Sequence, residues 1–334
     1  MDNYHKLVPN DPNVATGTTA IRGKSYSYII ACPSATPLLT IFLLHGFPDL
    51  SFGWRYQIPY FVSLGYQVVA PDMLGCGGSA RPEDLGCYTF KSIANDIKAL
   101  ARELVGENKI VLGGHGLGGA AVWRTAMWHP DLVLGVFSIA TPFLPPPTVF
   151  LAPDDPVLTF QPRSRNAGDA MGGNSKGPQG AGKSSDYPWE GVRSCGKIET
   201  TYGVRLLFRH LAKLRQTGLI SRRESLVYCR QYLPYSGPQV EGALRWFHFQ
   251  TRCYNYDEER HFFLNPVQCL TPALYISGDR DESVIAGIAS GMRRYFHNLI
   301  CMKVPGTYWC MWESAVDVNK QVADWMATLP VDAM

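Results

Sequence analysis

One glycine-rich segment constrains the fold of this chain more than any other feature. Residues 110–112 are apolar, residues 113–119 read Gly-Gly-His-Gly-Leu-Gly-Gly, and a helical stretch follows over Ala120–His129. This order predicts a buried strand, a sharp turn and a helix, in which glycines allow a strained backbone and a close approach of strand and helix. The apex of such a turn normally carries a Ser, Cys or Asp nucleophile, but here it is Gly116, which has no side chain.

Strands and helices are expected to alternate on either side of this turn. Apolar runs predict strands at Leu38–Leu44, Gln67–Ala70, Lys109–Leu112, Leu134–Ile139, Ala273–Ile276 and Leu299–Val304. Helical spacing is found at Trp54–Leu64, Phe90–Val105, Glu282–Phe296 and Ala315–Ala327. The alternation predicts an α/β fold with a mostly parallel sheet and helices on both faces.

A long interruption divides the alternating pattern. We therefore expect a core formed by residues 1–142 and 269–334, with a cap inserted at 143–268 whose residues 201–262 are helical. Residues 164–186 are rich in Gly and Ser, which predicts either a surface flap or a stretch of misannotated coding sequence. A basic stretch in the cap is interpreted as a solvated helix face; it comprises Arg205, Arg209, Lys213, Arg215, Arg222 and Arg223.

Composition excludes several classes of function. A net charge of +3 over 334 residues is too small to indicate a nucleic-acid partner. No apolar run is long enough for a membrane span, and the first residues lack a signal-peptide core, so we expect a cytoplasmic protein. Nine cysteines without a CxxC motif indicate reduced thiols, and neither a metal nor a cofactor is expected.

Several motifs together resemble one family. Residues 43–79, which include His-Gly-Phe-Pro, and residues 111–143 resemble the α/β-hydrolase-fold epoxide hydrolases, most closely their fungal members. Residues 211–225 and 251–259 resemble the cap of that family, and the segments Gly-Asp-Arg-Asp and TYWCMWESAVDVN resemble its C-terminal half. The resemblance implies the α/β-hydrolase fold, an aspartate nucleophile, a histidine base paired with an acid, and two tyrosines in the cap.

Most positions that the resemblance marks as catalytic carry other residues. The nucleophile falls on Gly116, the histidine base on Tyr308, and only the acid persists, as Asp281. The first cap tyrosine falls on Phe160, and the second on Phe247 or Phe249. Because Gly116 cannot attack carbon and a phenol is a weak base at neutral pH, ordinary epoxide hydrolysis is not expected.

The backbone part of the site needs no particular side chain. The fold implied by the resemblance forms an oxyanion hole from two N–H groups, which would be those of Phe47 and Leu117. Apolar residues would surround it, namely Trp54, Phe143, Phe160, Phe247, Phe249 and Trp309. His115, beside the apex, is expected to point into the sheet as a core histidine.

Four functions remain open at this stage. The first is a repurposed enzyme, a monomer or homodimer, that converts a hydrophobic secondary-metabolite intermediate by cyclisation or isomerisation, with Asp281 and Tyr308 as acid–base groups. The second is a hydrolase that acts on an epoxide or ester through an atypical site. The third is a catalytically inactive protein that binds a ligand, and the fourth is a decaying gene.

Overall fold

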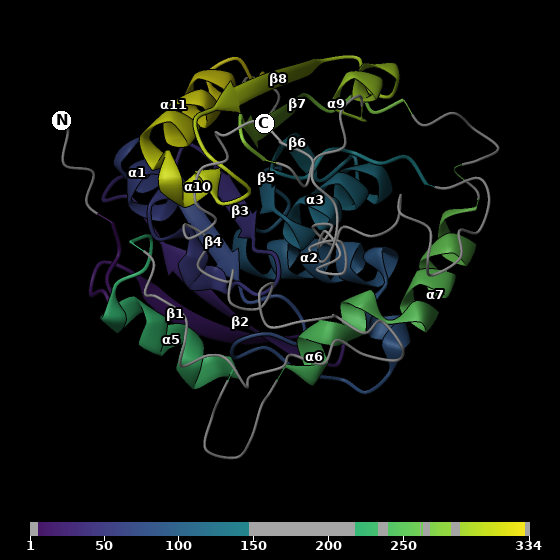
Figure 1. Ribbon diagram of the computed structural model, residues 1–334, viewed down its shortest axis with the longest axis horizontal. Helices are drawn as coiled ribbons and strands as arrows, with labels where there is room; N and C mark the ends of the chain where they lie inside the picture. The colour runs from purple at the N-terminus through teal and green to yellow at the C-terminus, as the bar shows by residue number, and fades with distance from the viewer. Residues whose placement is uncertain are drawn as a thin grey trace, which may run out of the picture.

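The computed structural model describes residues 6–146, 218–232, 240–260, 262, 268–281 and 288–330. An eight-stranded sheet in the order β1-β2-β4-β3-β5-β6-β7-β8 forms its centre (Figure 1). The strands are β1 (Ala15–Ile21), β2 (Lys24–Ala31), β3 (Thr40–Leu44), β4 (Gln67–Pro71), β5 (Ile110–His115), β6 (Val133–Ile139), β7 (Ala273–Gly278) and β8 (Leu299–Val304). Every pair of neighbouring strands from β4 to β8 in this sheet order, including those of β3, is parallel, which confirms the predicted mostly parallel α/β sheet.

The hairpin β1–β2 is an addition to the predicted strands. It is antiparallel, and β2 also pairs antiparallel with β4. Its two-residue turn, Arg22-Gly23, has φ angles of 48° and 78°, as a twisted hairpin turn requires. The Arg-Gly turn was available as a signal in the sequence, but β1 has too few apolar residues to show as a buried run.

Helices cover both faces of the sheet, as predicted. On one face, α1 (Gln57–Ser63) packs against α11 (Ala315–Met326), and on the other α2 (Phe90–Val105) packs against α3 (Leu117–Trp128) (Figure 1). Shorter elements are η1 (Ser51–Trp54), η2 (Leu85–Tyr88), α9 (Ile288–Gly291), η5 (Met292–Arg294) and α10 (Cys310–Glu313). Of the helix predicted at Glu282–Phe296, the described part is therefore α9 and η5.

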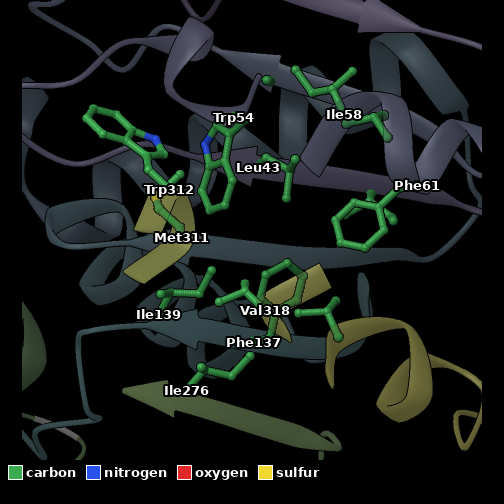
Figure 2. Packing of buried hydrophobic residues seen from close by; sticks show 14 of the residues in the cluster. Leu43, Trp54, Ile58, Phe61, Phe137, Ile139, Ile276, Met311, Trp312 and Val318 are labelled. Carbon is green, nitrogen blue, oxygen red and sulfur yellow. The ribbon is translucent and has the colours of Figure 1, made fainter. Parts of the chain in front are cut away.

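Each face of the sheet has its own apolar core. On the α1 side, Leu43, Phe137, Ile139 and Ile276 project from the strands towards the side chains of Trp54 and Trp312 and of α1 and α11 (Figure 2). Trp54 is fully buried there. This packing fixes the strands whose carboxyl ends carry the candidate site.

Among the described residues between β6 and β7 are the helices α5 (Arg222–Tyr232), α6 (Glu241–Leu244) and α7 (Phe249–Glu259), with η4 (Arg245–Phe247). Hydrogen bonds join them to the loops after β3 and β4, from Tyr228 to Asp49 (2.9 Å) and from Trp246 to the carbonyl of Leu74 (2.7 Å). They therefore cover the carboxyl ends of the parallel strands, where ligands bind in such sheets. We call residues 218–232, 240–260 and 262 the cap helices.

Some predictions fall outside the described residues. They include Phe160, the Gly/Ser-rich segment 164–186, and Arg205, Arg209, Lys213 and Arg215 of the basic stretch. The other two members of that stretch, Arg222 and Arg223, are exposed at the start of α5, as expected. Within the described part of the chain, no helix is both long and apolar enough to cross a membrane.

Candidate active site

The predicted turn joins β5 to α3. Gly116 has φ 56° and ψ −123°, a conformation that L side chains rarely adopt, and α3 begins at the next residue. The flanking glycines are required by close packing: a Cβ at Gly118 would lie 2.0 Å from the carbonyl oxygen of Leu44, and one at Gly114 would lie 2.3 Å from that of Gly118. The structure thus places a residue without a side chain at the apex of the turn.

The hydroxyl of Tyr308 occupies the space beside this apex. A Cβ built on Gly116 would lie 2.0 Å from Tyr308 Oη and 3.1 Å from its Cζ. A side chain at position 116 and the observed position of the Tyr308 hydroxyl therefore exclude each other. Side chains at these two positions, which are far apart in the sequence, would thus occupy the same space at the N-terminus of α3.

The loop that carries Tyr308 is held from two sides. His115 Nε2 lies 2.8 Å from the carbonyl oxygen of Tyr308, and the two rings are 4.5 Å apart. The N–H of Thr307 donates to the Glu313 carboxylate, and the Thr307 hydroxyl lies 3.0 Å from both carboxylate oxygens. These contacts fix the backbone of the loop at Tyr308.

His115 is a neutral core residue, as expected from its place beside the apex. It is fully buried, and burial lowers its pKa to about 4. At neutral pH its Nε2–H can donate to the Tyr308 carbonyl, while Nδ1 has no hydrogen-bond partner among the described residues. His115 therefore supports the loop and does not carry charge into the site.

Two backbone N–H groups near the apex belong to Phe47 and Leu117. Gly46, which precedes Phe47, packs so tightly on the turn that an added Cβ would lie 2.8 Å from the carbonyl oxygen of His115 and 3.1 Å from the nitrogen of Leu117. Among the described residues, the N–H groups of Phe47 and Leu117 have no hydrogen-bond acceptor. Both residues are half-buried, so these donors are available for an oxygen atom of a ligand.

Asp281 lies in the loop after β7, next to the loop of Tyr308. The N–H of Arg280 donates to the Gly306 carbonyl (2.8 Å), and the N–H of Gly306 donates to Asp279 Oδ1 (2.9 Å). Burial, and after it the carboxylate of Asp281, raises the pKa values of Tyr275 and Cys310. Asp281 is thus close to Tyr275 and Cys310, and the structure brings its loop next to the loop of Tyr308.

The predicted aromatic walls separate into two groups. Trp54, Phe143 and Trp309 are at most 4 % exposed and belong to the cores, with Trp309 stacked on Trp312 at 4.3 Å. Phe247 is 36 % exposed, and its ring lies 5.8 Å from that of Phe47. Of the alternatives Phe247 and Phe249, only the side chain of Phe247 is described, and it lies beside Phe47.

Sequence reasoning missed a polar group next to Phe47. Asp49 is fully buried, and its neighbours include Tyr228 and Tyr232 of α5. A signal existed, because the two tyrosines are four residues apart and so share one face of a helix. Among the described residues no group of three or more His, Cys, Asp or Glu could hold a metal ion.

Comparisons with known proteins agree with the observed fold. A family model described as "alpha/beta hydrolase fold" matches residues 40–308. The chain is 28% identical to "Epoxide hydrolase srdG" of Neurospora crassa over 96% of this chain and 97% of that one. It is 26% identical to rat "Bifunctional epoxide hydrolase 2" over 96% of this chain and 57% of the other.

Solved structures show the same fold. Epoxide hydrolase A from Mycobacterium thermoresistibile matches with a TM-score of 0.68 at 21% identity, over 95% of this chain and 99% of that one. Epoxide hydrolase VrEH1 from Vigna radiata matches with a TM-score of 0.70 at 19% identity, over 96% and 100% of the two chains. The chain belongs to the alpha/beta hydrolase fold family and is epoxide-hydrolase-like.

Proposed function

We propose that this epoxide-hydrolase-like protein converts an apolar small molecule, such as a secondary-metabolite intermediate, by cyclisation or isomerisation without a covalent enzyme intermediate. The observation that carries the proposal is the apex of the turn, where Gly116 offers no nucleophile and the Tyr308 hydroxyl fills the adjacent space. A covalent ester needs a side-chain nucleophile at this point, whereas proton transfer needs only a positioned hydroxyl.

The roles follow from the positions of the groups. The N–H groups of Phe47 and Leu117 bind the oxygen of a carbonyl or epoxide on which negative charge develops. Tyr308 moves a proton at that oxygen or at a neighbouring carbon, with Asp281 as the second acid–base group. Phe247 and the ring of Phe47 supply an apolar wall that holds the substrate in a reactive conformation.

The proposal also includes an architecture and a cellular setting. We retain the division into core residues 1–142 and 269–334 with a cap at 143–268, and the role of Phe160, Phe249, Trp54, Phe143 and Trp309 as pocket residues. We further propose a cytoplasmic monomer or homodimer. Free thiols support a reducing compartment: the eight cysteines that the structure describes are all unpaired.

Isotope labelling tests the reaction class. The full chain is incubated with styrene oxide and with 6,7-epoxygeraniol, an epoxide that can cyclise, in H₂¹⁸O, and products are identified by mass spectrometry. Cyclisation or isomerisation gives a product of unchanged mass, whereas hydrolysis gives a diol that contains ¹⁸O. Formation of the labelled diol by the wild-type chain would contradict the proposal, and binding without any product would favour a ligand-binding protein.

Two variants locate the reaction in the proposed site. Tyr308→Phe keeps the ring and removes the hydroxyl, so we expect turnover to fall about 100-fold with little change in KM. The double variant Gly116→Asp/Tyr308→His places the nucleophile and base expected from the resemblance, and we expect it to gain hydrolysis of styrene oxide. Unchanged turnover in Tyr308→Phe would remove Tyr308 from the mechanism.

A further inference from the structure

A buried polar group connects the cap helices to the loop of Phe47. We call residues 45–50 the oxyanion loop and the contacts of Asp49 with α5 the latch. The carboxylate of Asp49 is fully buried between the core and α5. A buried carboxylate is retained only where its surroundings supply hydrogen bonds, so these contacts define its role.

The contacts of Asp49 come from the loop and from α5. Within the loop, the N–H of Asp49 donates to the carbonyl of Gly46 (3.1 Å), and its Oδ1 accepts from the N–H of Leu50 (2.8 Å). From α5, the Tyr228 hydroxyl donates to the same Oδ1 (2.9 Å), and the Tyr232 hydroxyl donates to the carbonyl oxygen of Asp49 (2.7 Å). Two turns of one cap helix thus hold both the side chain and the backbone of a single loop residue.

Phe47 lies between these fixed points. On one side Gly46 packs on the backbone of His115 and Leu117, and on the other Asp49 is held by α5. The Phe47 ring packs edge-to-face on the rings of Tyr232 and Phe247, with centroid distances of 6.3 Å and 5.8 Å. Two cap segments therefore also contact its side chain. The direction of the Phe47 N–H is therefore set jointly by the turn and by α5.

The position of α5 is itself fixed at its first turn. Glu224 forms ion pairs with Arg55 (3.0 Å) and Lys6 (2.9 Å), and the Arg55 guanidinium lies 4.2 Å from the Trp312 ring centroid. A Cβ at Gly53 would overlap the carboxylate of Asp49, so the segment after the loop is shaped around this group as well. Several independent contacts therefore hold the latch in place. The hydroxyl groups of Tyr228 and Tyr232 are the parts of it that mutation to Phe can remove.

We infer that Asp49, Tyr228 and Tyr232 are positioning residues through which the cap sets the Phe47 N–H to bind the substrate oxygen. The inference rests on the proposed function, because it gives that N–H its role as a donor. The inference goes beyond the proposed function because it makes the binding of the substrate oxygen depend on the position of one cap helix, α5. None of the three residues touches the reacting atoms.

Hydrogen exchange tests the latch without any substrate. In the double variant Tyr228→Phe/Tyr232→Phe, which keeps both rings, we expect amides of the oxyanion loop to exchange about 10-fold faster. Amides of residues 113–119 should exchange at the wild-type rate. Tyr88→Phe is the matched control, since the buried Tyr88 ring donates its hydroxyl to the carbonyl of Pro82, outside the site. Unchanged exchange in the oxyanion loop of the double variant would overturn the inference.

A pair of probes tests the donor. Butyrophenone has a carbonyl oxygen that the N–H can bind, and butylbenzene is a similar molecule without it. We expect the wild type to bind butyrophenone more tightly than butylbenzene. In the double variant the ratio of the two affinities should fall about 5-fold, while the affinity for butylbenzene stays the same. An equal loss for both probes would contradict a positioning role. If the wild type shows no preference, the proposed function fails, while the exchange experiment still decides whether the latch exists.

Discussion

The turn at Gly116 and the loop of Tyr308 meet at one point but are built in different ways. The turn is held by backbone packing, in which glycines allow main-chain atoms of β3, β5 and α3 to lie in contact. The loop of Tyr308 also packs on backbone at its base, where Gly306 and Thr307 approach Gly278, but at Tyr308 itself it is held by side chains, namely those of His115 and Glu313. Backbone packing leaves almost no alternative residues, whereas a side-chain-held loop can accept new residues at its tip. We therefore expect the turn to tolerate fewer substitutions than position 308.

The largest effect is expected where the backbone packing is broken. In Gly118→Ala the new Cβ would lie 2.0 Å from the Leu44 carbonyl oxygen, and no flexible side chain can move to relieve the overlap. We expect a loss on the order of 4 kcal/mol in the free energy of unfolding, measured by urea denaturation. Gly291→Ala is the control, since Gly291 has φ −67° and no described atom within 4 Å of the added Cβ. A small loss in Gly118→Ala would show that the turn is not held by its backbone.

The second effect is a pH dependence of stability, and it tests the role of His115 in supporting the loop of Tyr308. The pKa of His115 is about 4 in the folded chain and about 6.5 in the unfolded chain, so between these values the unfolded state binds more protons. The free energy of unfolding should therefore fall by about 3 kcal/mol as the pH drops from above 6.5 to 4. In His115→Gln, which retains a donor for the Tyr308 carbonyl, this part of the pH dependence should vanish. Equal pH profiles for the two proteins would contradict a neutral buried His115.

The sequence predicted what repeats regularly and missed what depends on tertiary contacts. The strand Leu299–Val304 and the helix Phe90–Val105 have the predicted bounds, because an apolar run and a helical spacing mark them strongly. The strands Ala15–Ile21 and Lys24–Ala31 were missed, since the first faces solvent along much of its length. The helix predicted at Trp54–Leu64 begins only at Gln57, after a short 3₁₀ turn.

The candidate site shows the same limit. The glycine spacing predicted the turn and the place of Gly116 at its apex, because these depend on local backbone geometry. The overlap between position 116 and the Tyr308 hydroxyl depends on how two distant loops pack, so no local pattern reveals it. The same holds for Asp49, whose partners Tyr228 and Tyr232 lie in an inserted segment.

A third, smaller effect joins the two regions directly. Gly116→Ala places a Cβ on the Tyr308 hydroxyl, which is the end of a side chain that can move, so part of the overlap is relieved. In a Tyr308→Phe background the hydroxyl is absent, and we expect Gly116→Ala to cost about 1–2 kcal/mol less than in the wild type. A double-mutant cycle of thermal or urea unfolding measures this coupling. Additive effects would show that the two positions do not share a volume in solution.

The smallest effect concerns the side-chain support of the Tyr308 loop alone. Thr307→Val removes the hydroxyl that bonds to Glu313 but keeps the shape of the side chain, and the backbone N–H of residue 307 can still donate to the carboxylate. We expect a loss of about 1 kcal/mol in the free energy of unfolding, with Thr307→Ser close to the wild type. The loss is far below that of Gly118→Ala because one hydrogen bond is removed and no backbone atoms overlap. If Thr307→Val were as damaging as Gly118→Ala, the loop of Tyr308 would be as intolerant of change as the turn, and the contrast between the two regions would not hold.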